Sequence, residues 1–218
     1  MVKTKIIDRI YKYIEKTYGY SEPFFLKELY IEFSDVKQGT IREYMRRLLN
    51  NGKVIKAKNG VYELPDPNRI LKTPTVSISK VVNQSYLFDN DGRRIGYQSG
   101  FNFANQMGLT TQTASVTTIF SNTVSKKKRN ITLNKNRLII NAPRVIIDDN
   151  NYRLLQVLDL LLKYEMYSEY DLKKVSQKLI KYFSRGNLSK EKIEEIVDEY
   201  PLGAQVKFYK MGGSNVIT

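Results

Sequence analysis

The sequence predicts an α+β protein in which helices come first, short strands follow, and helices return at the end. Apolar residues recur at helical spacing over the first 50 positions, and turn-bounded runs of strand-forming residues follow as far as residue 141. From residue 148 onward the helical spacing returns. With 218 residues, of which 41% are hydrophobic, the chain is long and apolar enough to fold as one or two ordered domains.

Two amphipathic helices are expected at the start of the chain. Residues 3–18 place Ile and Tyr near a 3.6-residue period with Lys and Glu between them, and Gly19 fits a helix stop. A turn is expected at Pro23, and a second short helix over residues 25–33.

A third helix and a hairpin follow closely. Asp35 and Gln38 have the spacing of a capping box, and Asn51-Gly52 is a typical helix end. The apolar face of this helix holds Ile41, Tyr44, Met45 and Leu48. Two strand-like runs, residues 54–55 and 61–64, flank an Asn-Gly pair, the strongest short hairpin signal. Three helices and a two-stranded hairpin predict a winged helix-turn-helix domain over residues 1–66.

Residues 67–218 are expected to form a second domain with two parts. The first, 67–147, is predicted to be mixed α/β with short antiparallel strands, and the second, 148–218, helical. Its expected elements are a short helix at 77–82, a hairpin at 86–97 around Asn90-Asp91-Gly92, a helix at 99–107 before Gly108, strands at 115–121, 130–133 and 137–141, and helices at 152–164, 170–183 and 189–200, the last opened by Ser189. The tail around Gly212-Gly213 is expected to be loose.

Composition excludes several classes of function. The chain has no Cys and no His, which removes disulfides, zinc-finger sites and nucleophilic triads that use a His base. It has 36 Lys and Arg against 22 Asp and Glu, for a net charge of +14, which favours a polyanionic partner. The excess is +6 over residues 1–74, +8 over 75–147 and zero over 148–218.

The remaining composition favours a cytoplasmic protein without a cofactor. No apolar run approaches the length of about 18 residues that a membrane span needs, and the N-terminus lacks the apolar core of a secretory signal. The glycines form no nucleotide-binding fingerprint. We therefore expect no metal, no cofactor and no membrane contact.

The third helix carries the candidate DNA-reading residues. On a helical wheel its outer face is rich in Arg and amide side chains, which can bind guanine and adenine edges, and Gly39 allows close approach. The candidates there are Gln38, Gly39, Thr40, Arg42, Arg46, Arg47 and Asn50. In the wing, Lys53, Lys56 and Lys58 suit phosphates. Glu43 repels phosphate unless it pairs with Arg47 or reads cytosine.

A second basic patch consists of Lys126, Lys127, Lys128 and Arg129. Four consecutive cations on an expected hairpin loop are suited to phosphate, although a solvated loop tip has the same composition. The carboxylate pairs Asp89/Asp91 and Asp148/Asp149 fit a turn and a helix start better than a catalytic site. We therefore expect no catalytic residues, and a nuclease stays the least favoured function.

Two segments resemble a known family. Thr40–Pro65, with Gly60-Val61-Tyr62 in its wing, is similar to the winged-helix domain of the AbiEi abortive-infection antitoxins. Ser99–Gln112, which ends in Gly-Leu-Thr-Thr-Gln, resembles a later segment of the same family and is followed by similar strands. The likeness spans roughly residues 1–145.

This resemblance implies a non-enzymatic antitoxin of a type IV toxin–antitoxin system for phage defence. Such antitoxins repress their own operon by binding inverted repeats in the promoter DNA through the winged helix. They counter a nucleotidyltransferase toxin without needing a stable complex with it. Two alternatives stay open: a module that uses the winged helix to contact RNA or protein, and a plain transcriptional repressor without a toxin.

Overall fold

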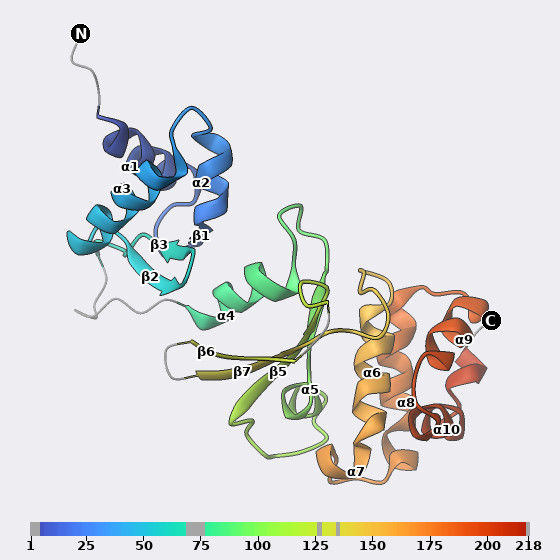
Figure 1. Cartoon of the computed structure of the whole chain (residues 1–218). Coiled ribbons are helices and arrows are strands. Elements are labelled where there is room, and N and C mark those ends of the chain that lie inside the picture. The colour runs from blue at the N-terminus through green and yellow to red at the C-terminus, as the bar shows by residue number, and fades with distance from the viewer. Residues whose placement is uncertain (1–4, 69–76, 126–127, 134–135, 217–218) are drawn as a thin grey trace. The chain divides into compact units, whose positions relative to one another are not determined.

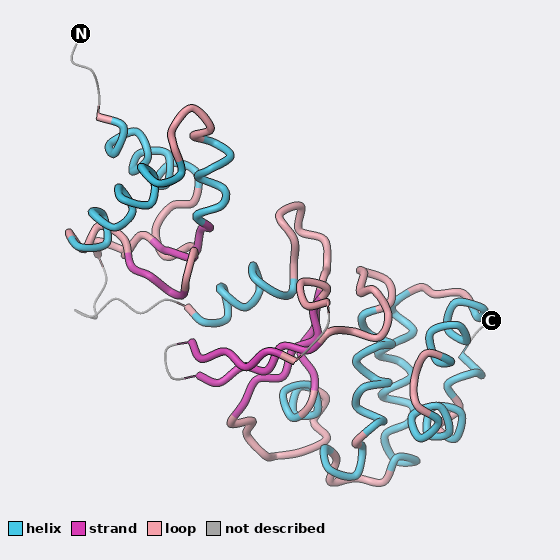
Figure 2. The backbone as a smooth tube through the Cα atoms, in the orientation of Figure 1, coloured by secondary structure: helices cyan, strands magenta, loops and turns pink. Residues whose placement is uncertain are grey.

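A computed structural model of the chain describes residues 5–68, 77–125, 128–133 and 136–216. The chain divides into two compact units, Met1–Gln84 and Ser85–Thr218. Figure 1 labels their helices and strands, and Figure 2 separates these from the connecting loops. The α+β class is confirmed, since helices with a small antiparallel sheet come first, a mixed four-stranded sheet follows, and helices form the end.

The first unit contains helices α1 to α4 and a three-stranded antiparallel sheet. Its strand order is β1-β3-β2, so the two strands of the predicted hairpin gain a third strand beside them. The elements are α1 (Ile6–Thr17), β1 (Pro23–Phe25), α2 (Leu26–Glu32), α3 (Gln38–Asn50), β2 (Ile55–Lys58), β3 (Val61–Glu63) and α4 (Ile78–Val82).

The predicted apolar stripes form the core of this unit. Helix α1 buries Ile10 and Ile14, and α3 buries Ile41, Met45 and Leu48. The sheet adds Phe24 and Tyr62, whose rings stack with centroids 6.0 Å apart. Because every apolar position of α3 is used by the core, its opposite face remains for solvent or a ligand.

Two local predictions in this unit are wrong. Pro23 begins β1 rather than a turn, and it is tolerated because β1 is an edge strand and Pro stands at its first position. Asp35 does not cap α3, which has Lys37 at its N-cap without a side-chain hydrogen bond. Asp35 lies within the preceding turn, where the Val36 amide donates to the Phe33 carbonyl.

The hairpin β2–β3 is confirmed with Asn59-Gly60 at its turn. Gly60 has a φ of 77°, a left-handed conformation that glycine adopts without steric cost. Lys58 pairs with Val61, and Ile55 pairs with Glu63. This geometry places Lys56 and Lys58 on β2, while Lys53 lies between the end of α3 and β2.

The second unit is built on the sheet order β4-β5-β7-β6. Its elements are β4 (Gly96–Ser99), α5 (Phe101–Gln106), β5 (Val116–Ser121), β6 (Arg129–Leu133), β7 (Asn136–Asn141), α6 (Tyr152–Leu162), α7 (Tyr164–Tyr167), α8 (Leu172–Phe183), α9 (Lys190–Asp198) and α10 (Leu202–Lys210). A π-helical turn at Asn83–Leu87 and 3-10 turns at Ser184–Gly186 and Gly213–Val216 complete the described elements.

The prediction of purely antiparallel strands is wrong for one pair. Strands β5 and β7 run parallel, with Thr118 opposite Ile139. Strand β7 lies between β5 and β6, so the segment that joins β5 to β6 is not a hairpin loop. The predicted hairpin at 86–97 is reduced to one bridge, Phe88 to Arg94, because Tyr97 pairs with Phe120 of β5 instead.

Helix α6 is the centre of the second core. Every residue from Leu154 to Leu161 is buried, which includes two polar side chains. One of them, Gln156, donates to the Gln98 carbonyl of β4 at 2.8 Å and accepts from the Tyr182 hydroxyl at 2.6 Å. Figure 1 shows α8, α9 and α10 gathered beside α6. The buried amide therefore ties the helical layer to the sheet.

As far as Val216 the tail is folded, contrary to the sequence prediction, because a 3-10 turn at Gly213–Val216 follows α10. Helix α10 buries Phe208, which is 1% exposed, against Phe183. Lys207 of α10 donates to the Leu161 carbonyl at 3.1 Å and pairs with Glu165. The predicted cap at Ser189 is confirmed, because its hydroxyl accepts from the Lys192 amide at 3.3 Å.

One glycine in the sheet has no room for a side chain. A Cβ at Gly96 would lie 2.0 Å from the Tyr86 carbonyl oxygen and 2.7 Å from that of Phe120. These atoms are backbone, which cannot rotate away. Among the helices of the described ranges, none combines the length and the hydropathy of a membrane span.

Candidate nucleic-acid interface

Helix α3 presents the predicted candidates on the face opposite its core residues. Gln38, Gly39, Arg42, Arg46, Arg47 and Asn50 are exposed, whereas Thr40 is half-buried. Nothing lies within 4 Å of the place where a Cβ of Gly39 would stand. The structure thus brings the helix candidates together on one open surface about four turns long.

Glu43 binds two of the three arginines on this surface. Arg46 donates through Nε and Nη2 to its two carboxylate oxygens, both at 2.9 Å, and Arg47 donates through Nε at 3.0 Å. These bonds, that from Arg46 being the larger contribution, lower the pKa of Glu43 to about 2. The sequence left the pair with Arg47 at i+4 spacing open as one of two alternatives for Glu43, whereas it gave no indication of the pair with Arg46.

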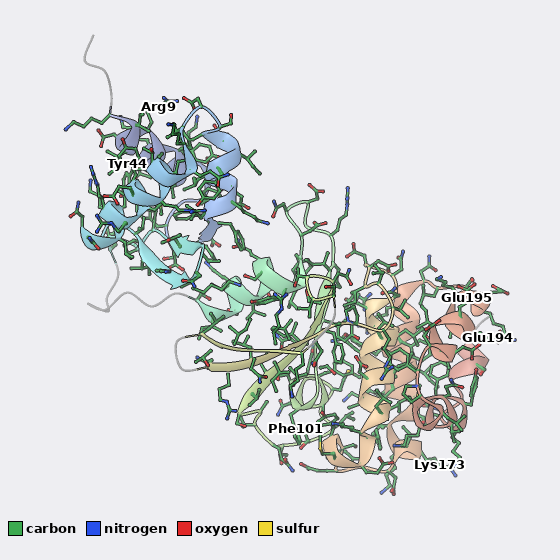
Figure 3. The ribbon with its side chains drawn as sticks, in the orientation of Figure 1. Arg9, Tyr44, Phe101, Lys173, Glu194 and Glu195 are labelled. Carbon is green, nitrogen blue, oxygen red and sulfur yellow. The ribbon has the colours of Figure 1, made fainter. Side chains whose placement is uncertain are left out.

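The two guanidinium groups remain accessible although they are paired. The Arg46 and Arg47 side chains are 65% and 58% exposed. The Arg47 guanidinium also lies 5.8 Å from the ring centroid of Tyr44, which Figure 3 labels on α3. Glu43 therefore holds the guanidinium groups of Arg46 and Arg47 in place on the surface without covering them.

Arg42 is positioned by the neighbouring helix. Its Nε donates to the Tyr30 hydroxyl of α2 at 2.7 Å, and its guanidinium lies 5.7 Å from the centre of that ring. Tyr30 lies in the second helix expected over residues 25–33 and was not among the predicted DNA-contacting residues. The signal that marks its second role is the hydroxyl itself, because a Phe would fill the same space without reaching Arg42.

The wing lysines differ in exposure. Lys56, in the middle of β2, and Lys53, before it, are exposed, and the Lys53 ammonium lies 5.1 Å from the ring centre of Tyr11. Lys58 is half-buried, and burial lowers its pKa to about 8. Lys56 and Lys53 are thus the better placed of the three for phosphate.

The second basic patch is described only in part. Lys126 and Lys127 lie outside the described residues, Lys128 is exposed, and Arg129 is the exposed first residue of β6. These residues belong to the second unit, whereas α3 and the wing belong to the first.

The carboxylate pairs serve local structure. Asp89 accepts from the Asp91 and Arg93 amides, both at 2.9 Å, within its turn. Asp148 accepts from the Asn150 and Asn151 amides, both at 2.8 Å, at the start of α6. Over the described ranges, no three Asp or Glu side chains are grouped so that they could hold a metal ion.

Comparison with known proteins adds no family to these observations. The sequence matches no family model and no curated protein. The functional argument therefore depends on the geometry of α3, the wing and the second unit.

Proposed function

We propose that the first unit is a winged helix-turn-helix that binds promoter DNA, with α3 in the major groove and the β2–β3 wing on the phosphates. The observation that carries this proposal is the outer face of α3. It combines three arginines with the terminal amides of Gln38 and Asn50, while its inner face is fully used by the core. Arginine binds guanine edges, and amides bind adenine edges, in bidentate geometry.

The wing and the charge distribution support the same assignment. Lys53, which lies between α3 and β2, and Lys56, which lies within β2, are both exposed cations. Lysine contacts phosphate without reading the base sequence. The chain carries a net charge of +14, which accelerates and strengthens binding to a polyanion. Lys128 and Arg129 add exposed cations in the second unit, where Lys127 is expected to assist them.

We further propose that the chain is an AbiEi-like antitoxin that represses its own operon and counters a nucleotidyltransferase toxin. The sequence likeness of Thr40–Pro65 and Ser99–Gln112 motivates this second step. The helices after residue 148 carry no excess charge, which suits a role other than DNA binding. A reading frame for a nucleotidyltransferase beside this gene is the expected genomic context, and coexpression should relieve the toxicity of its product.

The DNA proposal is tested by fluorescence anisotropy with a labelled fragment of the chain's own promoter. The Arg42→Ala/Arg46→Ala double variant should bind at least about tenfold more weakly than wild type and lose its preference for the inverted repeats. Lys173→Ala, which removes an exposed cation of the second unit, should bind like wild type. Wild-type affinity in the double variant would disprove the assignment of α3.

Two further arms of this assay address the alternatives. A structured RNA of equal length, added as competitor at low salt, should displace the promoter fragment less well than unlabelled promoter does. Stronger competition by RNA would favour the RNA-binding module instead. Repression without any effect on the neighbouring toxin would favour the plain repressor.

A further inference from the structure

The second unit contains a pocket of 260 Å³ between one face of the mixed sheet and the junction of α6 with α7. The sheet contributes Thr118 and Phe120, the helical side contributes Asp159, Lys163 and Tyr167, and Lys128 comes from the chain just before β6. Small-molecule sites commonly measure about 300–1,000 Å³. The pocket lies near the lower end of this range, so it suits a small ligand.

Two lysines supply the positive charge of this pocket. Lys128 belongs to the basic patch of the sequence, and Lys163 is the C-cap residue that follows α6 in the C-terminal helical block. Both are exposed, and neither forms a salt bridge with a residue of the described ranges. The fold thus brings together two cations from distant segments on one small cavity, which favours an anionic group such as a phosphate.

Asp159 supplies a carboxyl group to the same pocket. Its side chain lines the pocket although the residue is only 6% exposed. The Tyr97 hydroxyl donates to its Oδ2 at 2.6 Å, which fixes the orientation of the carboxyl. A fixed carboxyl in a pocket that also holds two lysines favours a ligand that carries both a hydrogen-bond donor and an anionic group.

An aromatic surface and two hydroxyls complete the site. The ring of Phe120 is backed by Tyr97, with ring centroids 5.5 Å apart and planes 24° apart. Thr118 and Tyr167 both line the pocket, and each hydroxyl oxygen lies 3.5 Å from the position that a Cβ on Gly100 would take. Phe101, labelled in Figure 3, holds the Tyr167 ring edge-on at 5.0 Å.

We infer that this pocket binds a nucleoside monophosphate. The base lies against Phe120 and donates its exocyclic amino group to Asp159, while Lys128 and Lys163 bind the phosphate. Thr118 and Tyr167 are placed to contact the sugar hydroxyls. Such a site lies in the second unit and shares Lys128 with the basic patch, so it gives this chain a way to respond to a small metabolite.

Isothermal titration of the full-length protein with AMP, CMP, GMP and UMP tests this inference. At least one of the three nucleotides that carry an exocyclic amino group should bind about tenfold more tightly than UMP, which lacks one, and than inorganic phosphate. Lys163→Gln should weaken that binding at least about tenfold. Lys173→Gln removes another exposed lysine, on α8 and labelled in Figure 3, and should leave the binding unchanged.

Asp159→Asn gives the complementary test at the base end. It should reduce the preference for the amino-bearing nucleotide over UMP to less than about threefold, while circular dichroism confirms that the variant is folded. The inference is overturned if no nucleotide binds at millimolar concentration, if inorganic phosphate binds as tightly as the nucleotides, or if Lys163→Gln binds like wild type. Binding of a short RNA without binding of any mononucleotide would overturn it equally.

Discussion

The hydroxyl of Tyr97 in β4 donates a hydrogen bond of 2.6 Å to Oδ2 of Asp159 in α6. This bond joins the sheet of the second unit to its central helix at a buried carboxyl. Burial raises the pKa of Asp159 from 3.8 to about 7, while the hydrogen bond from Tyr97 and the charge of Arg144 act in the opposite direction. Whether the Asp159 carboxyl is protonated therefore affects the stability of the whole second unit.

Replacing Asp159 by Asn should remove a pH dependence of folding. Because the folded pKa exceeds the unfolded value, the folded state holds more protons between pH 3.8 and about 7. The contribution of Asp159 to the unfolding free energy is then greatest below about pH 4 and is lost as pH rises through 7. Asp159→Asn should be more stable than wild type at pH 8, by about 1–3 kcal/mol.

Urea unfolding, followed by circular dichroism at pH 4, 5.5, 7 and 8, measures this effect. Glu194→Gln, an exposed change on α9 that Figure 3 labels, should keep the wild-type pH profile. An unchanged profile in Asp159→Asn would show that another group is responsible.

Tyr30→Phe should weaken DNA binding without unfolding the protein. The change keeps the ring beneath Arg42 and removes only the hydroxyl that accepts from its Nε. Loss of one such hydrogen bond is worth about 0.5–1.5 kcal/mol, or roughly a two- to tenfold loss of affinity for the promoter. Tyr44→Phe, which keeps the ring beside Arg47, is the matched control and should bind like wild type. Equal affinities for the two variants would remove Tyr30 from the positioning of Arg42.

Glu43→Gln should strengthen binding to DNA of any sequence. The carboxylate repels phosphate and holds Arg46 and Arg47, so its neutralisation frees two cations for the backbone. We expect affinity for random duplex to rise about two- to fivefold and the ratio of promoter to random affinity to fall. Anisotropy titrations with both duplexes measure the ratio. A lower affinity for both duplexes would mean that the arrangement of Arg46 and Arg47 around Glu43 is itself required for DNA binding.

Lys56→Ala should change the salt dependence rather than the sequence preference. A lysine that neutralises one phosphate contributes about 0.9 to the slope of log affinity against log salt. Titrations between 50 and 300 mM salt should therefore give a slope lower by about this amount, equally for promoter and random duplex. A slope equal to that of wild type would place the wing away from the DNA backbone.

Phe208→Ala should destabilise the second unit strongly. The ring is buried against Phe183, and removal of a buried Phe side chain typically costs about 3–5 kcal/mol. Leu202→Ala changes a residue of the same helix that is 72% exposed and should alter stability by less than about 0.5 kcal/mol. Thermal unfolding of both variants makes the comparison. Similar midpoints for the two would mean that α10 contributes little to the fold.

The sequence predicted elements well where their signals are local. The apolar period of α3, the Asn59-Gly60 turn and the Ser189 cap each depend on residues within one or two turns of chain, and all three are confirmed. The outer face of α3 follows directly from that period. Its candidates are therefore found together on the surface.

The errors arose where distant segments decide the outcome. Strand β1 forms because Pro23–Phe25 pairs with β3, which is far along the chain. In the second unit β6 lies at the edge of the sheet, beyond β7, so that β7 pairs with β5 in parallel. Helix α10 was missed because its apolar residues do not all lie on one face. Leu202, Val206 and Tyr209 are exposed, so the sequence shows no clear apolar stripe. Likewise, nothing near Tyr30 in sequence shows that its hydroxyl meets Arg42.

The close packing of the main chain around Gly96 limits which residues can replace it during evolution. The exposed lysines are open to drift, whereas any side chain at position 96 would collide with the main chain of residues 86 and 120. Because peptide oxygens cannot be replaced by mutation, no second substitution nearby creates the missing space. A distant descendant that keeps this sheet must therefore keep this glycine.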